Sequence, residues 1–190
     1  MRDVQPLEGK GVREELCQFS SPYLYSMVHK LLLCIYLLGA APVLAQTDPG
    51  ITITRDNAAA VIVRHEEWSA FRRIDVQARE KDGSMHTFSG VAVSDLLQKA
   101  GVPMGNQLRG ENMAQYLVVK ASDKYRVLFA LPELDSAFTD RTVIVADQMD
   151  GQPLRQDRGP YRIIVPGEKK PARWIYQVTS LAVHAVNKED

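Results

Sequence analysis

Gly159-Pro-Tyr-Arg-Ile-Ile-Val-Pro-Gly167 is the most informative stretch of this chain. Residues 161–165 favour an extended strand, and they lie between a Gly-Pro and a Pro-Gly pair, which mark turns. Upstream, Asp150-Gly-Gln-Pro-Leu154 begins with an Asp-Gly turn signal. Downstream, Ala172-Arg-Trp174 leads into the last extended stretch. The C-terminal part of the chain is therefore predicted to consist of strands joined by tight turns.

Short strands are also predicted through most of the chain between residue 50 and this segment. Alternating apolar residues on both sides of Lys81-Asp-Gly-Ser84 predict a hairpin over 73–88. The remaining expected strands are 51–54, 116–121, 125–129, 142–146, 161–165 and 174–186. A helical spacing of apolar residues that stops at Gly101 predicts a helix over 93–100. With short helical turns at 65–71 and 131–134, the fold class is α+β and mainly β, with mixed sheets and two or three short helices.

Charge and cysteine content exclude several kinds of function. The 190 residues carry 23 Lys and Arg against 23 Asp and Glu. A nucleic-acid binder held by bulk charge would be basic, so no nucleic-acid partner is expected. Cys17 and Cys34 are the only cysteines. A cysteine zinc site, a disulfide framework and a cysteine nucleophile are therefore excluded from the main body, and we assign no catalytic or metal-binding residue.

The first 45 residues have the pattern of a leader. A basic start after Met27, an apolar stretch and Val43-Leu-Ala45 predict a signal peptide over 27–45. Residues 1–26 are then an over-extended reading frame, and 46–190 form one domain without a permanent membrane span. The expected location is periplasmic or secreted. The alternative is a cytoplasmic tail before a membrane anchor.

Two motifs that follow one another along the chain carry a family resemblance. The first is Ser89-Gly-Val-Ala-Val-Ser-Asp-Leu-Leu-Gln-Lys-Ala-Gly-Val102, and the second is the segment from Asp150 to Trp174 quoted above. Together they resemble the oxidoreductase molybdopterin-binding domain of the sulfite-oxidase family, over roughly residues 50 to 186. The resemblance implies the mixed, mainly β fold of that family and molybdopterin as a cofactor.

The same resemblance shows where this chain departs from the family. Family enzymes hold molybdenum through a cysteine thiolate in a loop before the helix motif. The equivalent stretch here, 75–83, is a hairpin without cysteine. Arg64-His65 lacks the family's asparagine, and Asp123-Lys-Tyr125 stands where the family has Asp-Gly-Tyr. Redox catalysis of the sulfite-oxidase type is therefore not expected, and whether the chain is an enzyme at all stays open.

Positive charge is concentrated in residues 155–173. This segment contains six Lys and Arg but only two acids, Asp157 and Glu168. Glycine turns on both sides of the strand at 161–165 can bring the cations together. Such a cluster suits a phosphate or pyrophosphate. The predicted cofactor-binding residues are Arg162, Lys169, Lys170 and Arg173. Arg162 lies within an apolar strand, so it is either a ligand contact or half of a structural ion pair.

Two functions follow from these observations. The first is an exported molybdopterin-binding protein without classical redox catalysis. The second is a non-catalytic module that binds a small anion or a partner protein. His65, His86 and His184 have no metal-binding spacing and are expected as surface or hairpin residues, without a serine–histidine pair. Trp68, Phe71, Trp174 and Tyr176 are expected in the core.

Overall fold

The computed structural model describes residues 50–56 and 58–186. The chain divides into two units, Met1–Gln46 and Thr47–Asp190, and every described residue belongs to the second unit. The predicted over-extended start at 1–26 and signal peptide at 27–45 lie outside the described residues. Within the described residues, none of the helices has the length and apolar character needed to cross a membrane.

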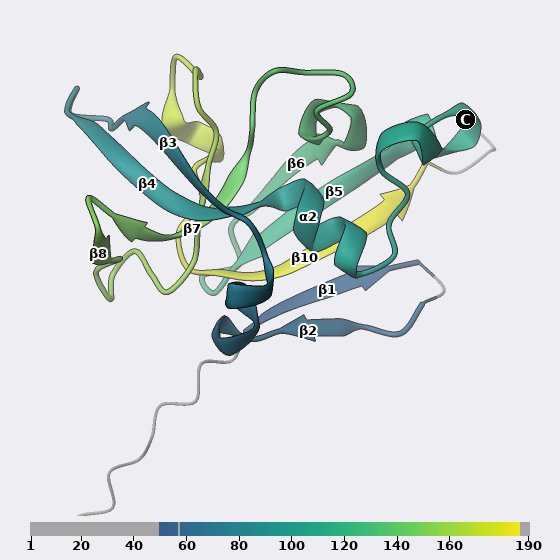
Figure 1. The fold of residues 1–190 in the computed structure, drawn as a ribbon, viewed down its shortest axis with the longest axis horizontal. Helices are drawn as coiled ribbons and strands as arrows, with labels where there is room; N and C mark the ends of the chain where they lie inside the picture. The colour runs from purple at the N-terminus through teal and green to yellow at the C-terminus, as the bar shows by residue number, and fades with distance from the viewer. Residues whose placement is uncertain (1–49, 57, 187–190) are drawn as a thin grey trace, which may run out of the picture. The chain divides into compact units, whose positions relative to one another are not determined.

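The first sheet brings the two ends of the described chain together. Its strand order is β2-β1-β10-β5-β6, and β10 occupies the centre (Figure 1). β1 pairs in parallel with β10, whereas the other neighbours are antiparallel. The strand bounds are β1 Ile51–Arg55, β2 Val61–Val63, β5 Gln115–Ala121, β6 Arg126–Ala130 and β10 Val178–Ala185.

The second sheet contains the predicted hairpin. Its order is β3-β4-β7-β8, and β9 also pairs with β7. The strand bounds are β3 Arg73–Arg79, β4 Met85–Ala92, β7 Ile144–Met149, β8 Gln152–Pro153 and β9 Arg162–Ile164. The register of β4 against β7 shifts between Ser89 and Gly90. A side chain at Gly90 would overlap the Val145 backbone at this shift, so the close approach of the two strands requires glycine.

The α-helix α2, Val93–Lys99, follows β4 directly. It begins where the Val93 amide donates to the Val143 carbonyl at 3.0 Å. Leu96 and Leu97 are fully buried in one apolar core that includes residues of both sheets. Burying each of these side chains contributes about 1.5–3 kcal/mol, so the helix is held mainly by its packing. The apolar spacing that predicted this helix marks its buried face.

The mainly β fold with mixed sheets is confirmed, with differences at strand ends. The strand predicted at 142–146 begins at Ile144, and the Val143 carbonyl just before it accepts the first amide of α2. The stretch predicted as extended from 174 begins as a strand only at Val178, after a 3-10 turn at Pro171–Arg173. The short helical turns at His65–Ala70 and Leu131–Leu134 are also 3-10 turns.

The aromatic residues expected in the core are mostly there. Trp68 and Trp174 are 2% and 3% exposed, and Phe71 packs against the same cluster while partly buried. Tyr176 is the exception, because it is 38% exposed. Its ring covers the guanidinium of Arg162, so it lies at the edge of the core rather than inside it.

Candidate anion-binding site

Arg162 is inside the protein and pairs with an acid through its two terminal nitrogens, whereas its buried Nε has no hydrogen-bond partner within the described residues. Its side chain is 0% exposed. Nη1 donates to Glu80 Oε1, and Nη2 donates to Glu80 Oε2 at 3.2 Å and to the Tyr176 hydroxyl at 3.1 Å. The rings of Phe88, Trp174 and Tyr176 lie 4.3–5.5 Å from the guanidinium carbon. Of the two roles open from the sequence, the structure shows the ion pair.

Glu80 holds this pair at the end of β3. Burial acts to raise its pKa, but the hydrogen bond and charge of Arg162, with the nearby charge of Arg158, outweigh burial and lower it. Arg158 Nη1 lies 3.3 Å from Glu80 Oε1. Glu80 is therefore an ionised carboxylate between two arginines. An ion pair of this kind costs much to break, because the remaining charge is left buried.

Arg173 also forms ion pairs with carboxylates of the protein. Its Nε donates to Glu168 Oε1 at 2.8 Å, and its Nη1 donates to both carboxylate oxygens of Glu133 at 3.1 and 3.2 Å. The guanidinium also lies over the Phe129 ring, 4.4 Å from its centre. Burial acts to lower the Arg173 pKa, but the two carboxylates outweigh it and raise it. Arg173 joins the 167–173 loop to the start of the Leu131–Leu134 turn.

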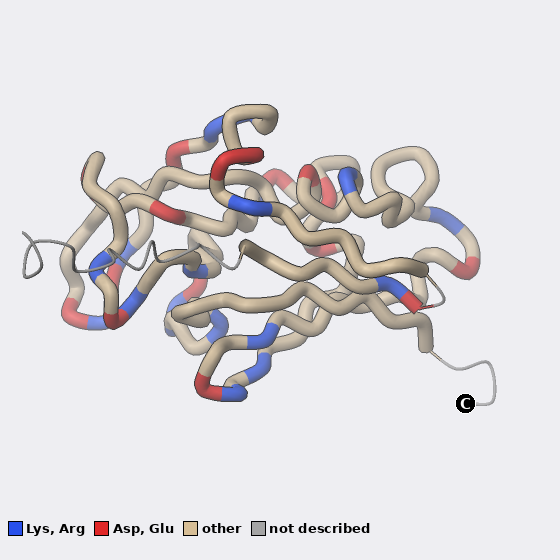
Figure 2. The backbone as a smooth tube through the Cα atoms, turned by 90° about the horizontal axis from the view of Figure 1, so that it is seen from below, with Lys and Arg blue, Asp and Glu red and all other residues tan. Residues whose placement is uncertain are grey.

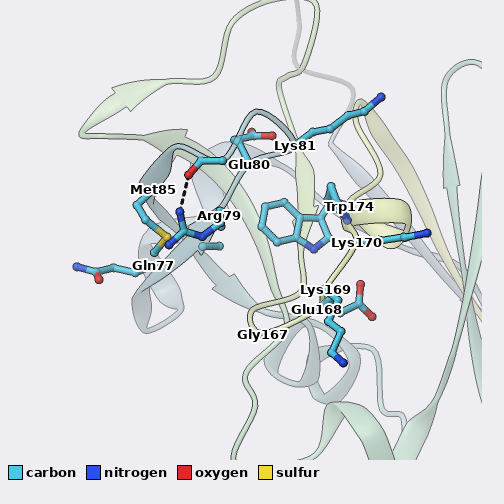
Figure 3. Close-up of a pocket in the computed structure, with 13 residues that line it drawn as sticks. Gln77, Arg79, Glu80, Lys81, Met85, Gly167, Glu168, Lys169, Lys170 and Trp174 are labelled. Atoms are coloured by element: carbon cyan, nitrogen blue, oxygen red, sulfur yellow. Dashed lines mark hydrogen bonds between the residues drawn. The ribbon is translucent and has the colours of Figure 1, made fainter.

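A pocket of about 600 Å³ lies beside these two ion pairs. One wall is the β3–β4 hairpin and the other is the loop after Pro166, with Trp174 between them (Figure 3). The lining residues are Gln77, Ala78, Arg79, Glu80, Lys81, Gly83, Met85, Gly167, Glu168, Lys169, Lys170, Pro171 and Trp174. The structure thus places Lys169 and Lys170 in the pocket lining, whereas Arg162 and Arg173 are not among the lining residues.

The pocket lining carries more free positive than negative charge. Its two acids, Glu80 and Glu168, are each bound to an arginine of the protein. Lys81, Lys169 and Lys170 are exposed, and none forms an ion pair within the described residues. Elsewhere the two signs of charge are mixed along the chain (Figure 2). The available cations at this pocket are therefore mainly lysine ammonium groups.

Comparison with known proteins shows the family of this chain. The family model of the oxidoreductase molybdopterin binding domain matches residues 52–188. The chain belongs to this family. The matched range includes both walls of the pocket of this molybdopterin-binding domain.

A solved structure shows the same fold. The crystal structure of the sulfane dehydrogenase SoxCD from Paracoccus pantotrophus matches the molybdopterin-binding domain with a TM-score of 0.59 and 21% sequence identity. The match covers 77% of this chain and 41% of that chain, so the present chain spans less than half of the length of the dehydrogenase chain. No curated protein matches the sequence.

The residues of this molybdopterin-binding domain suit a phosphate group better than molybdenum. The hairpin that the family resemblance places at the cysteine loop supplies Gln77, Ala78, Arg79, Glu80, Lys81 and Gly83 to the pocket wall. The lining contains no cysteine, and its one sulfur atom is the thioether of Met85. Within the described part of the chain, no three His, Cys, Asp or Glu residues are grouped to hold a metal. The lysines fit an anion, but the lining lacks the thiolate that binds molybdenum in the family.

Sequence reasoning missed the contribution of the hairpin to this site. Arg79, Glu80 and Lys81 lie more than 80 residues before Lys169 and Lys170 in the chain. Arg79 donates to the Gly83 carbonyl at 2.6 Å across the hairpin turn. The Lys81-Asp-Gly-Ser84 turn signal located these residues at the tip of a hairpin. Only the tertiary fold shows that this tip faces the 167–171 loop.

Proposed function

We propose that this protein is an exported member of the molybdopterin-binding family that binds a phosphate-bearing small molecule without redox catalysis of the sulfite-oxidase type. The observation that carries the proposal is the composition of the pocket. The wall that corresponds to the family's cysteine loop contains lysine and arginine but no thiolate. A pterin phosphate, the anionic part of the family's cofactor, is the ligand that this chemistry suits best.

The geometry limits how the anion is held. Arg162, which is buried, and Arg173, which is partly exposed, are already bound to carboxylates, so they are not available as bidentate phosphate ligands. Lys169 and Lys170 supply point charges from the loop, and Lys81 supplies another from the hairpin. Trp174 and Met85 add apolar surface to the pocket lining, with Trp174 between the hairpin and the loop (Figure 3). A planar ring with a phosphate tail would use both kinds of surface.

The first experiment measures metal content. The full chain is expressed in a host that makes the molybdenum cofactor, and the processed protein is purified from the export compartment. We expect elemental analysis to give much less than one molybdenum per chain, with no sulfite oxidation. One molybdenum per chain with turnover would overturn the non-redox proposal. N-terminal sequencing of the same sample tests export, because cleavage after Ala45 leaves Gln46 first.

The second experiment measures anion binding by calorimetry with pyrophosphate as the probe. The double variant Lys169→Gln/Lys170→Gln should lower the affinity about tenfold or more, because two phosphate contacts are lost. Lys120→Gln is the matched control, since Lys120 is an exposed lysine of β5 outside the pocket lining. Unchanged affinity in the double variant would show that the pocket is not the anion site.

The alternative is a module that binds a partner protein. The exposed lysines and Met85 around the pocket support it, because a mixed apolar and basic surface suits an acidic peptide. Failure of pyrophosphate to bind, together with retention of one specific protein on the immobilised wild type but not on Lys169→Gln/Lys170→Gln, would favour this second function.

A further inference from the structure

The first sheet ends at β6, a strand that pairs on one side only. β6 is the last strand in the order β2-β1-β10-β5-β6 and lies beside β5 (Figure 1). The other edge strand, β2, has three residues, whereas β6 has five. The sequence of β6, Arg-Val-Leu-Phe-Ala, has one charged residue and no proline, although charge and proline are common means of keeping an edge strand from pairing. β6 is therefore the edge of this sheet at which a further strand would add most readily.

The register of β5 and β6 shows which peptide groups of β6 point outward. The Ala121 amide donates to the Tyr125 carbonyl at 3.0 Å where the hairpin begins. Because bonded and unbonded pairs alternate along an antiparallel ladder, every second residue of β6 turns its amide and carbonyl away from β5. These residues are Arg126, Leu128 and Ala130. Their outward groups are the ones that an added strand would bind.

The turn at Pro171–Arg173 lies along this outward side of β6. Arg173 Nη1 donates to the Leu128 carbonyl at 3.3 Å. The Tyr125 hydroxyl, just before β6, donates to the Ala172 carbonyl at 3.2 Å. Two consecutive residues of the turn are thus bound at or next to the strand. The turn takes up the space beside Leu128 that an added strand would need.

Glu133 closes the far end of the same edge. Its Oε1 accepts the Ala130 amide at 2.8 Å, and its carboxylate also pairs with Arg173 and with Arg141. Loss of Arg173 would leave Glu133 with Arg141 as a cationic partner, so the Ala130 end would stay closed. The Leu128 carbonyl, in contrast, would be released. Access to the middle of the strand therefore depends on Arg173.

We propose that β6 is a self-association surface, on which β6 of a second copy pairs in the antiparallel direction, and that the Pro171–Arg173 turn keeps this surface shut. With the far end closed, the outward groups left for pairing belong to Arg126 and Leu128. A two-fold axis at Val127 places Arg126 of each copy opposite Leu128 of the other, and both of these pairs are then hydrogen-bonded.

The side chains of β6 suit a second copy as the partner. In this register no like charges face each other, because the one charged residue, Arg126, lies opposite a leucine. The Leu128 side chain, which is 54% exposed, gains a cross-strand neighbour. Pairing at β6 needs no ligand in the anion pocket, so it is independent of the proposed function.

The test measures the oligomeric state of the full chain and its variants by sedimentation equilibrium, without ligand. The wild type should be largely monomeric. In Arg173→Met the dimer dissociation constant should fall about tenfold or more, because the Leu128 groups become available for pairing. Circular dichroism shows in parallel whether each variant is folded. A folded Arg173→Met protein that dimerises no more than the wild type would overturn the proposal.

A second substitution in the Arg173→Met background locates the contact between the copies. Leu128→Lys should restore the monomer, because the lysine then lies opposite Arg126 of the second copy and like charges oppose pairing. Ile62→Lys is the matched control, since Ile62 lies on the other edge strand and is 46% exposed. It should leave the dimer intact. Dimers that survive Leu128→Lys, or that Ile62→Lys abolishes as well, would show that the copies do not meet at β6.

Tyr125→Phe decides the question if loss of Arg173 prevents folding. This variant removes the hydroxyl that holds Ala172 but keeps the ring, at a position that is 52% exposed. With Arg173 still in place, the dimer dissociation constant should fall by a smaller factor, about threefold, as expected for one lost hydrogen bond. Adding Leu128→Lys should again reverse the change. An unchanged dissociation constant in Tyr125→Phe, with Arg173→Met unfolded, would refute the role of the turn.

Discussion

Arg162 and Glu80 form a bidentate ion pair although 82 residues separate them in the chain. The pair joins β9 to the end of β3 and lies under three aromatic rings. The arginine of the most informative sequence motif therefore stabilises the fold beside the pocket. The cations that remain available to a ligand are the lysines of the pocket lining, whose side chains are exposed.

Removing Arg162 should destabilise the protein strongly. Arg162→Ala leaves the Glu80 carboxylate buried without its main partner, at a cost of about 3–5 kcal/mol in the free energy of unfolding. Urea denaturation measures this loss. The double variant Glu80→Gln/Arg162→Met should recover more than half of the loss, because it leaves no buried charge. A loss below 1 kcal/mol for Arg162→Ala would contradict the structural role.

The Glu80 ion pair should make stability depend on pH in the acid range. Because the folded pKa of Glu80 is lowered, its contribution is fully present above the unfolded pKa of glutamate, about 4.3, and is lost as the pH falls through the folded pKa. The difference in melting temperature between the wild type and Glu80→Gln should therefore be largest near pH 7. It should shrink steadily below about pH 4. A constant difference from pH 7 to pH 3 would argue against an ionised Glu80.

Arg173 should matter more for stability than a surface arginine. Arg173→Met removes hydrogen bonds to Glu133 and Glu168 and should cost about 1–3 kcal/mol. Arg155→Met is the comparison, because the side chains of Arg155 and its partner Asp157 are 74% and 56% exposed. That variant should change stability by less than about 0.5 kcal/mol. Equal effects in chemical denaturation would show that the Arg173 pairs contribute no more than surface pairs.

Gly90 should tolerate no side chain. An added Cβ would overlap the Val145 carbonyl oxygen and approach Ala146 Cα at 2.7 Å. Both contacts are backbone, so Gly90→Ala must displace β4 from β7, at a cost of about 3 kcal/mol or more. Ser89→Ala, at the neighbouring partly buried position, is the control. Thermal melting that places both variants within 2 °C of the wild type would contradict the close strand approach.

The strands could be predicted because local pattern and turn chemistry agree. The hairpin around Lys81-Asp-Gly-Ser84 appears as β3 and β4, and the apolar spacing after Ala92 appears as α2. The errors occur at strand ends that tertiary contacts decide. Val143 was expected in a strand, but its carbonyl accepts the first amide of α2. No local pattern in 142–146 contains that contact.

The site was only partly predictable for the same reason. The cation-rich 155–173 segment contains Lys169 and Lys170, which line the pocket. The segment does not reveal that Glu80 and Glu133 bind its arginines, because both acids come from distant parts of the chain. The assignment of Lys169 and Lys170 to a bound cofactor stays a prediction.

The position of β10 determines when the first sheet can form. β10 ends at Ala185 and lies between β1, which begins at Ile51, and β5. During synthesis or threading through a narrow channel, a chain that has emerged only as far as Leu134 has β1, β2, β5 and β6 without the strand that joins the first pair to the second. Two separate strand pairs are marginal in water. Folding of this sheet must therefore wait until β10 has been made, which favours slow, late assembly of the sheet.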